Sequence, residues 1–184
     1  SDVDPYGLFP VVPPGSGKYV LQLGNNSSGG QAEQASYTFV VPGNMSEFGL
    51  LYKYAIVLED PDHPASGQPR FEVKVYQKGS SVPLSCASFT YIASAGLPGF
   101  KPSNVNSAII YRDWSLGSID LTPYLGDTLV LEFSTGDCAY GGHFGYAYID
   151  VSCSGSNVNA IFCKSDSVLN LQAPPGFQQY YWYN

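Results

Sequence analysis

The stretch WSLGSIDLTPYLGDTLVLEFSTGDCAYGGHFGYAYIDVSC, residues 114–153, decides the fold expected for this chain of 184 residues. Within TLVLEF, the side chains of Leu129, Leu131 and Phe133 fall on one face, which is the period of two expected of a half-buried strand. The segment GYAYIDV, which begins at Gly145, repeats this alternation. The stretch therefore predicts three consecutive strands joined by two turn-rich loops.

The loop between the last two of these strands, STGDCAYGGHFG, is rich in glycine and in polar and aromatic side chains. Glycines allow tight turns, and loops of this kind carry function more often than strands do. Aromatic faces stack on the apolar side of a sugar ring, while a few fixed polar groups orient it. We expect a ligand-binding surface made by five residues: Asp137, Tyr140, His143, Tyr146 and Tyr148. The competing interpretation is that alternating aromatic residues pack within the sheet, and for Trp114 a role as a core anchor is favoured.

Further alternating segments occupy the rest of the chain up to Cys153. Two of them direct a row of apolar side chains to one face: Tyr19, Leu21 and Leu23 in KYVLQLG, and Tyr37, Phe39 and Val41 in ASYTFVVP. Residues 1–17 contain four prolines and three glycines, so we expect an extended segment that lies along the sheets. About eight or nine strands separated by turn signals, with no helix of useful length, predict an all-β fold, a two-sheet jelly-roll β-sandwich.

The composition limits the classes of partner. Charged residues make up 12% of the chain, aromatic residues 15%, and the formal net charge is −7. Nucleic-acid binders need clustered Lys and Arg, whereas the eight basic residues here are scattered, so we expect no nucleic-acid partner. No apolar run approaches the roughly 20 residues that span a bilayer, so we expect no membrane insertion. The chain opens with neither an initiator Met nor a signal peptide, which indicates a fragment or a processed product.

Four cysteines, Cys86, Cys138, Cys153 and Cys163, occur without any CxxC spacing. An even number of this kind favours disulfides over a zinc site, and disulfides indicate a location outside the cytoplasm. Three pairings are open. The short loop between Cys153 and Cys163 favours that pair, which leaves Cys86 with Cys138. The alternative is four free, buried thiols.

Enzymatic mechanisms find little support in the motifs. Only two histidines, His63 and His143, are present, and neither lies in a GxSxG or comparable context. Cys138 and His143 lie five residues apart in one loop, yet a disulfide to Cys138 would remove the nucleophile. We therefore expect that the protein is not an enzyme.

The chain changes character after Cys153. Residues 154–184 are polar at first and then contain a strand-like VLNLQ, a PPG turn and an aromatic YYWY. This order resembles the beginning of an Ig-like or PKD-like module, in which a strand, a Pro-Gly turn and a strand with a core Trp follow one another. We therefore divide the chain into a jelly-roll module, residues 1–153, and a segment 154–184 that comprises a linker and the first strands of an Ig-like module. About 30 residues cannot bury an apolar face alone, so Trp182 must find another partner.

The motifs also resemble those of known families. A Trp followed by IDLTPYLGDTLVLEF, a loop and GYAYIDV is similar to the closing half of galactose-binding-like jelly-roll domains. Together with YVLQLGN at residues 19–25 and YAIVLEDPDH with QPRFEVKV in residues 54–75, the loop STGDCAYGGHFGYAYID resembles modules of very large bacterial surface proteins of the gliding-motility and type IX secretion kind. The likeness runs from about Val12 to Cys153.

This resemblance implies a non-enzymatic module at the bacterial cell surface, outside the cell, that serves adhesion or carbohydrate binding within a longer multidomain chain. Its partner would be a glycan or another surface protein. The alternative is a structural spacer or protein-docking domain with no glycan ligand.

A calcium site is the one cofactor that we expect. Glu59, Asp60 and Asp62 supply hard oxygen ligands in one loop, and jelly rolls of the resembled kind often hold a structural Ca²⁺ near the final strand, where Asp150 lies. The four carboxylates are therefore candidate metal ligands. A solvated acidic turn, favoured by the neighbouring prolines, is the equally supported alternative.

Overall fold

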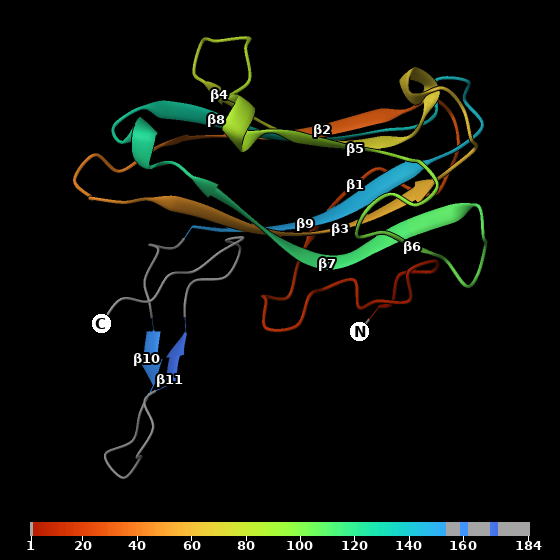
Figure 1. Ribbon diagram of the computed structural model, residues 1–184, viewed down its shortest axis with the longest axis horizontal. Helices are drawn as coiled ribbons and strands as arrows, with labels where there is room; N and C mark the ends of the chain where they lie inside the picture. The colour runs from red at the N-terminus through yellow and green to blue at the C-terminus, as the bar shows by residue number, and fades with distance from the viewer. Residues whose placement is uncertain (1, 154–158, 162–169, 173–184) are drawn as a thin grey trace.

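The computed structural model describes residues 2–153, 159–161 and 170–172, and the part up to Cys153 forms two antiparallel sheets that face each other (Figure 1). The five-stranded sheet contains, in spatial order, β1 (Leu21–Leu23), β9 (Gly145–Cys153), β3 (Gly49–Glu59), β7 (Ile109–Asp120) and β6 (Lys101–Pro102). The four-stranded sheet contains β2 (Ala32–Val40), β8 (Thr128–Gly136), β4 (Arg70–Gln77) and β5 (Phe89–Ile92). Among the described residues, three helices of the 3-10 type lie in the connections: η1 (Ala65–Gly67), η2 (Ser85–Ala87) and η3 (Thr122–Tyr124).

The order of the strands makes this sandwich a jelly roll. Between β1 and β9, the chain crosses from one sheet to the other at every connection except those from β4 to β5 and from β6 to β7. As a result the first strand pairs with the last, β1 with β9, and the second pairs with the last but one, β2 with β8. Eight strands wound in this way, with the short β6 added at one edge, confirm the predicted all-β, two-sheet jelly-roll sandwich.

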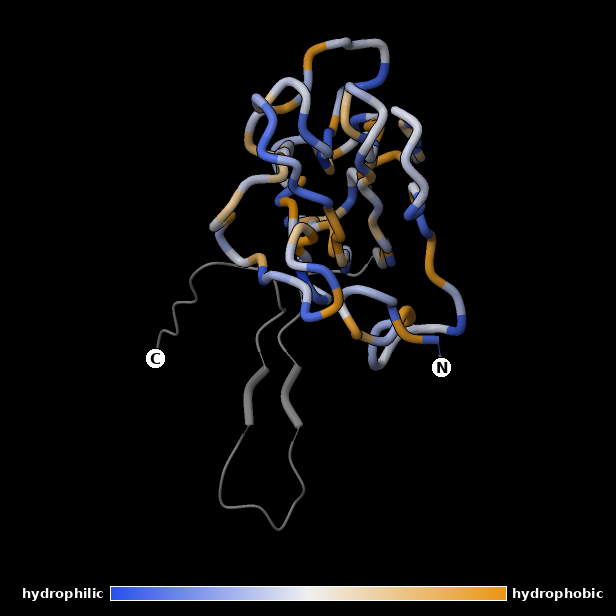
Figure 2. The backbone as a smooth tube through the Cα atoms, turned by 90° about the vertical axis from the view of Figure 1, so that its right-hand side faces the viewer, coloured by the Kyte–Doolittle hydropathy of each residue, from blue (hydrophilic) through white to orange (hydrophobic). Residues whose placement is uncertain are grey.

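The main hydrophobic core lies between the two sheets. On β8 the predicted row of Leu129, Leu131 and Phe133 is buried, and on β4 Phe71 and Val73 are fully buried by the same alternation. Figure 2, which views the sandwich along its strands, shows apolar segments in the middle of the molecule as well as in some outer loops. Hydrophobic burial between two pleated faces therefore holds the sheets together.

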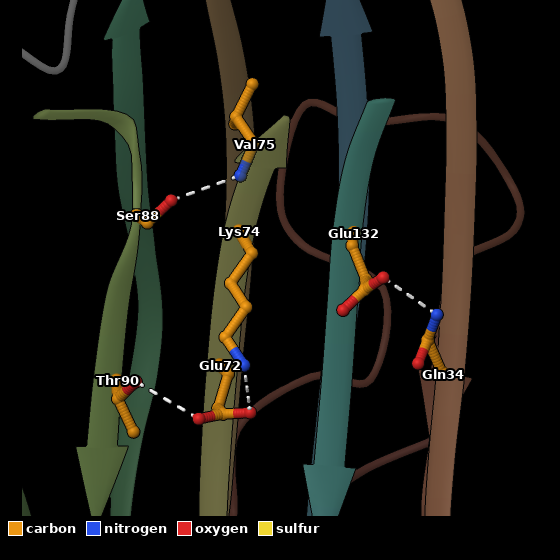
Figure 3. A network of polar contacts seen from close by, with 7 residues as sticks. All are labelled: Gln34, Glu72, Lys74, Val75, Ser88, Thr90 and Glu132. Carbon is orange, nitrogen blue, oxygen red and sulfur yellow. Dashed lines mark hydrogen bonds and ion pairs between the residues drawn. The ribbon is translucent and has the colours of Figure 1, made fainter. Parts of the chain in front are cut away.

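The outer face of the four-stranded sheet is polar. Lys74 forms an ion pair with Glu72 at 2.9 Å, Thr90 donates a hydrogen bond to Glu72 at 3.3 Å, and Gln34 donates one to Glu132 at 2.8 Å (Figure 3). Contacts of this kind near the surface add little to stability. They leave this face covered by charged and amide groups.

The outer face of the five-stranded sheet carries a second, smaller core, because the N-terminal segment lies across it (red in Figure 1). Phe9 is buried among the rings of Tyr111, Trp114 and Tyr148, with ring centroids 5.9 to 6.5 Å apart. The indole of Trp114 also donates a hydrogen bond to the carbonyl of Pro10 at 2.7 Å. This confirms that the proline-rich opening segment lies along the sandwich, and it gives Trp114 a role in holding the segment.

Two further strands follow the sandwich. β10 (Asn159–Ile161) and β11 (Asn170–Gln172) pair only with each other in the part of the chain that the structure describes. β11 falls within the predicted strand VLNLQ, whereas the PPG turn, Trp182 and Cys163 lie outside the described residues. The expected Ig-like module and the domain boundary at Cys153 therefore stay predictions. Within the described ranges, no helix combines the length and apolar character needed to cross a bilayer.

Candidate functional site

The loop at residues 136–145, predicted as the ligand-binding surface, turns most of its polar groups inward. Asp137 is buried, and its carboxylate accepts hydrogen bonds from the backbone N–H groups of Gln31 at 3.0 Å and Gly145 at 3.1 Å. The backbone N–H of Asp137 donates to the carbonyl of Gln31. Asp137 thus ties the loop to the start of β2, and its carboxylate is already engaged by the protein.

Tyr146 and Tyr148 are also buried, which corrects the expectation that they contact a ligand. Both lie on the outer face of β9 beneath the N-terminal segment, and their hydroxyl groups donate to the carboxylate of Asp4 at 2.7 and 3.1 Å. The other oxygen of Asp4 accepts from the backbone N–H groups of Tyr6 and Gly7. Burial, together with the nearby Asp4, raises the pKa of each phenol above its usual value. Neither ring offers a free face for stacking on a sugar.

Tyr140 and His143 occupy a mixed position. The side chain of Tyr140 is 70% exposed, and its ring lies at a right angle to that of His63, with 4.8 Å between their centroids. Tyr140 also covers Gly67, where an added Cβ atom would lie 2.7 Å from the tyrosine ring. His143 is half-buried and contacts His63 edge to face at 5.2 Å. Of the five predicted ligand-binding residues, Tyr140 is therefore the one whose ring is well exposed.

Both cysteines whose side chains are described are free thiols, so the predicted Cys86–Cys138 disulfide is wrong. Cys86 lies in η2 at the surface, whereas Cys138 is fully buried in the loop, with its sulfur 3.3 Å from Nδ1 of His63. A histidine from a distant loop therefore takes the place expected for the second cysteine. The predicted pair of Cys153 with Cys163 lies outside the described side chains.

The four carboxylates predicted as calcium ligands do not converge. Asp150 stands opposite Lys53 on β3, six residues before Glu59, which corresponds to about 20 Å along a strand. Asp60 uses Oδ1 to accept from the amide of Gln68 at 2.7 Å and from the backbone N–H of Asp62 at 3.1 Å. Asp150 thus cannot share one ion with the acidic loop, and calcium binding by Glu59, Asp60 and Asp62 stays a prediction.

The structure contains a cleft that sequence reasoning missed. It has a volume of about 530 Å³ and lies where β1 and β2, the strands at one edge of the sandwich, stand apart. Ten residues line it: Tyr19, Val20, Leu21, Ala35, Ser36, Tyr37, Phe133, Ile149, Asp150 and Val151. The side chains of Tyr19 and Tyr37 are 87% and 57% exposed. The cleft therefore combines two open aromatic rings with an apolar floor that includes Phe133 and Ile149.

The cleft follows from the same alternation that builds the core. Tyr19, Leu21 and Leu23 share one face as predicted, yet only Leu23 is buried. Tyr37 likewise belongs to the row that includes Phe39, which is half-buried and stacks on Tyr37 at 5.8 Å between ring centroids. The ends of these two rows, at Tyr19 and Tyr37, therefore extend past the region that the opposite sheet covers. A signal was present in the sequence, because each of these two apolar rows begins with a Tyr.

The cleft and the predicted loop are separate places on the molecule. Gly145, where the loop ends, and Val151, which lines the cleft, are six residues apart on β9, or about 20 Å. One ligand of one or two sugar rings cannot contact both. The two surfaces therefore represent two distinct candidate sites.

No family model and no curated protein matches this chain. Among solved structures, the chain is similar to TmCBM61, solved in complex with β-1,4-galactotriose, with 11% identity and a TM-score of 0.40 over 76% of this chain and 74% of that one. It is also similar to a chain of Broad Bean Stain Virus, with 11% identity and a TM-score of 0.29 over 83% of this chain and 98% of that one. Likenesses of this degree carry no argument about function, and the assignment as a jelly roll rests on the order of the strands.

Proposed function

We propose that the protein is a non-catalytic carbohydrate-binding module and that its glycan lies in the cleft between β1 and β2. The observation that carries the proposal is the pair of tyrosines, Tyr19 and Tyr37, whose rings and hydroxyl groups stand largely exposed at one cleft with an apolar floor. Glycan sites need an aromatic face for the apolar side of the ring and a few polar groups for its hydroxyls. The two tyrosine rings supply the aromatic face, and their hydroxyl groups supply polar partners.

The physical chemistry favours a weak, specific interaction. A ring stacked on an aromatic side chain gains on the order of 1 kcal/mol beyond the area that it buries. A hydrogen bond between a sugar hydroxyl and a tyrosine hydroxyl contributes roughly 0.5 to 1.5 kcal/mol. Since the cleft is open to solvent, these few contacts supply most of the binding free energy.

The test is a glycan array followed by titration of the sugar that binds, with the wild-type chain, Tyr19→Ala and Tyr37→Ala. Each substitution should weaken binding by about five- to fifty-fold, the loss of one stacked ring and its buried area. Tyr140→Ala is the matched control, because its ring is equally exposed but lies on the distant loop. Binding that survives both cleft substitutions and falls with Tyr140→Ala would move the site to the loop.

A second function is favoured by one specific feature. β1 and β2, which border the cleft, each pair with only one neighbour among the described strands, so their outer edges are free to accept another strand. A docking role, in which a neighbouring module or partner protein adds a strand here, would protect backbone amides of β2 from hydrogen exchange. A silent glycan array together with such protection in the presence of a partner would support docking over glycan binding.

The cellular setting is a further part of this proposal. We propose that the module works outside the cell as part of a longer surface protein of the gliding-motility and type IX secretion kind, for which the sequence motifs are the support. Labelling of intact cells that make the parent protein, with an antibody against this module, tests the location. Labelling only after the cells are broken would contradict it.

A further inference from the structure

Three metal-ligating side chains meet beneath the loop at residues 136–145. One ligand atom from each of His63, Cys138 and His143 lies within 4.8 Å of the others, and Nδ1 of His63 is 3.3 Å from the sulfur of Cys138. Cys138 is fully buried, and both histidines are half-buried. The three side chains therefore converge on one partly enclosed point.

A second observation at the same place points to a missing ligand. Nδ1 of His143 is buried and has no hydrogen-bond partner among the described residues. A buried nitrogen of this kind costs free energy unless something binds it, and buried polar groups in proteins are nearly always satisfied. The side chain of His143 thus presents an unsatisfied atom close to a thiol and a second imidazole.

We propose that His63, Cys138 and His143 bind a zinc ion. Thiolate sulfur and imidazole nitrogen are the ligands that zinc takes, whereas calcium requires oxygen. A tetrahedral zinc ion with ordinary bond lengths holds a sulfur and a nitrogen about 3.6 Å apart, so the three atoms need to move by no more than about 1 Å.

The surrounding backbone prepares the site. The N–H of Cys138 donates to the carbonyl of His143 at 3.0 Å, which closes the loop and places both side chains on the same side. The N–H of Tyr140 donates to the sulfur of Cys138 at 3.3 Å, as an outer-shell donor does for a metal thiolate. The N–H of Ala139 donates to the carbonyl of Gly67, which joins this loop to the one that carries His63. The ion would lock together two loops that are distant in sequence.

Three protein ligands leave one position of a tetrahedral ion for water or an outside ligand. Tyr140 lies against His63 and is exposed, so its ring forms the wall between the ion and solvent. A Cys–His pair can instead act as a nucleophile and its base. The complete burial of Cys138 argues against that role, because a nucleophile must reach its substrate.

The test uses the full chain, kept reduced, stripped of metal and titrated with Zn²⁺ or Co²⁺ alone. We expect about one ion per chain, and for Co²⁺ a thiolate charge-transfer band together with the intense visible bands of a tetrahedral site. Cys138→Ser should abolish the charge-transfer band, and His63→Gln and His143→Gln should each weaken binding at least about tenfold, the low end of what even an outer-shell partner is worth. Cys86→Ser is the matched control, because this exposed thiol lies outside the cluster and its loss should leave the band unchanged.

A second measurement keeps the proposal testable if Cys138→Ser fails to fold. Alkylation of the wild-type chain after brief partial denaturation, mapped by mass spectrometry, should modify Cys138 far less in the presence of Zn²⁺ than after chelation, while Cys86 is modified equally in both. A cobalt spectrum without thiolate bands, or a band that survives Cys138→Ser, would overturn the site. Equal alkylation of Cys138 with and without zinc would overturn it as well.

Discussion

The outer face of the five-stranded sheet and the cleft between β1 and β2 are both lined by tyrosines, but only the first surface is covered. On the outer face, Tyr146 and Tyr148 lie beneath the N-terminal segment and share the carboxylate of Asp4. At the cleft, Tyr19, which precedes β1, and Tyr37, on β2, stand largely exposed to solvent. The same residue type, in the same alternating pattern, is structural in one place and a candidate for binding in the other.

This contrast shows that the exposure of an aromatic row depends on segments far away in the sequence. Residues near Phe9 and Asp4 cover β9, more than 130 positions later in the chain. Nothing comparable among the described residues covers Tyr19. A substitution on either surface therefore shows whether that part of the molecule behaves as a core or as a free surface.

The largest effect is expected from Asp4→Ala, which removes the anchor of the covered surface. Asp4 is fully buried and accepts four hydrogen bonds, two of them from the hydroxyls of Tyr146 and Tyr148. Its loss leaves these donors without a partner, so we expect the free energy of unfolding to fall by about 3 to 5 kcal/mol. Urea denaturation measures this value.

Asp2→Ala is the matched control for that substitution. It removes the same charge from the same segment, but Asp2 is exposed, so stability should change by no more than about 0.5 kcal/mol. Equal effects of the two substitutions would show that the N-terminal segment does not hold the outer face of the sheet.

Raising the pH should also destabilise the covered surface, by a smaller amount than Asp4→Ala. Burial and the neighbouring Asp4 both raise the pKa of Tyr146 above the value near 10 that a tyrosine has in the unfolded chain. Below about pH 10 the phenol is protonated in both states and its contribution to stability is fully present. As the pH rises further, the unfolded chain releases the proton while the folded chain keeps it, so stability is lost by up to about 1.4 kcal/mol per pH unit for one such group.

Urea unfolding between about pH 9 and pH 11 measures this slope. Tyr52, Tyr54 and Tyr148 have pKa values raised chiefly by burial and should add to it. Tyr146→Phe should make the decline less steep. A decline that is unaltered by Tyr146→Phe would mean that this phenol ionises as freely when folded as when unfolded.

The sequence predicted which side chains share one face of a strand better than it predicted which segments would lie over that face. The period of two assigned Leu129, Leu131 and Phe133 to one face, and burial between the sheets followed because their hydrophobic side chains leave water. The same period placed Tyr146 and Tyr148 together, but it carried no information on what would lie over them. The competing view, that alternating aromatics pack within the sheet, was the right one for these two residues.

The candidate metal cluster was beyond the sequence for a similar reason. His63 and Cys138 are 75 positions apart and lie in two loops that the sandwich brings to the same end. Cysteine spacing cannot reveal a pairing on its own, and an even number of cysteines led to the wrong partner for Cys138. The sequence did single out the loop itself, because its glycines and polar residues differ from the strands on either side.

The smallest effect on stability is expected from a substitution at the cleft. A deletion of similar size on the covered surface gives the direct comparison. Tyr19→Ala should change the free energy of unfolding by no more than about 0.5 kcal/mol, because the ring is 87% exposed and its removal leaves no cavity. Phe9→Ala, a deletion of similar size on the covered surface, should cost about 3 to 5 kcal/mol, since the ring is packed among three others. Both values come from chemical denaturation of the two variants beside the wild type. A loss of about 2 kcal/mol or more on Tyr19→Ala, the lower limit for deleting a packed side chain, would mean that the ring of Tyr19 is packed in the folded protein. In that case the cleft would be an interior surface, and the glycan would have to bind elsewhere.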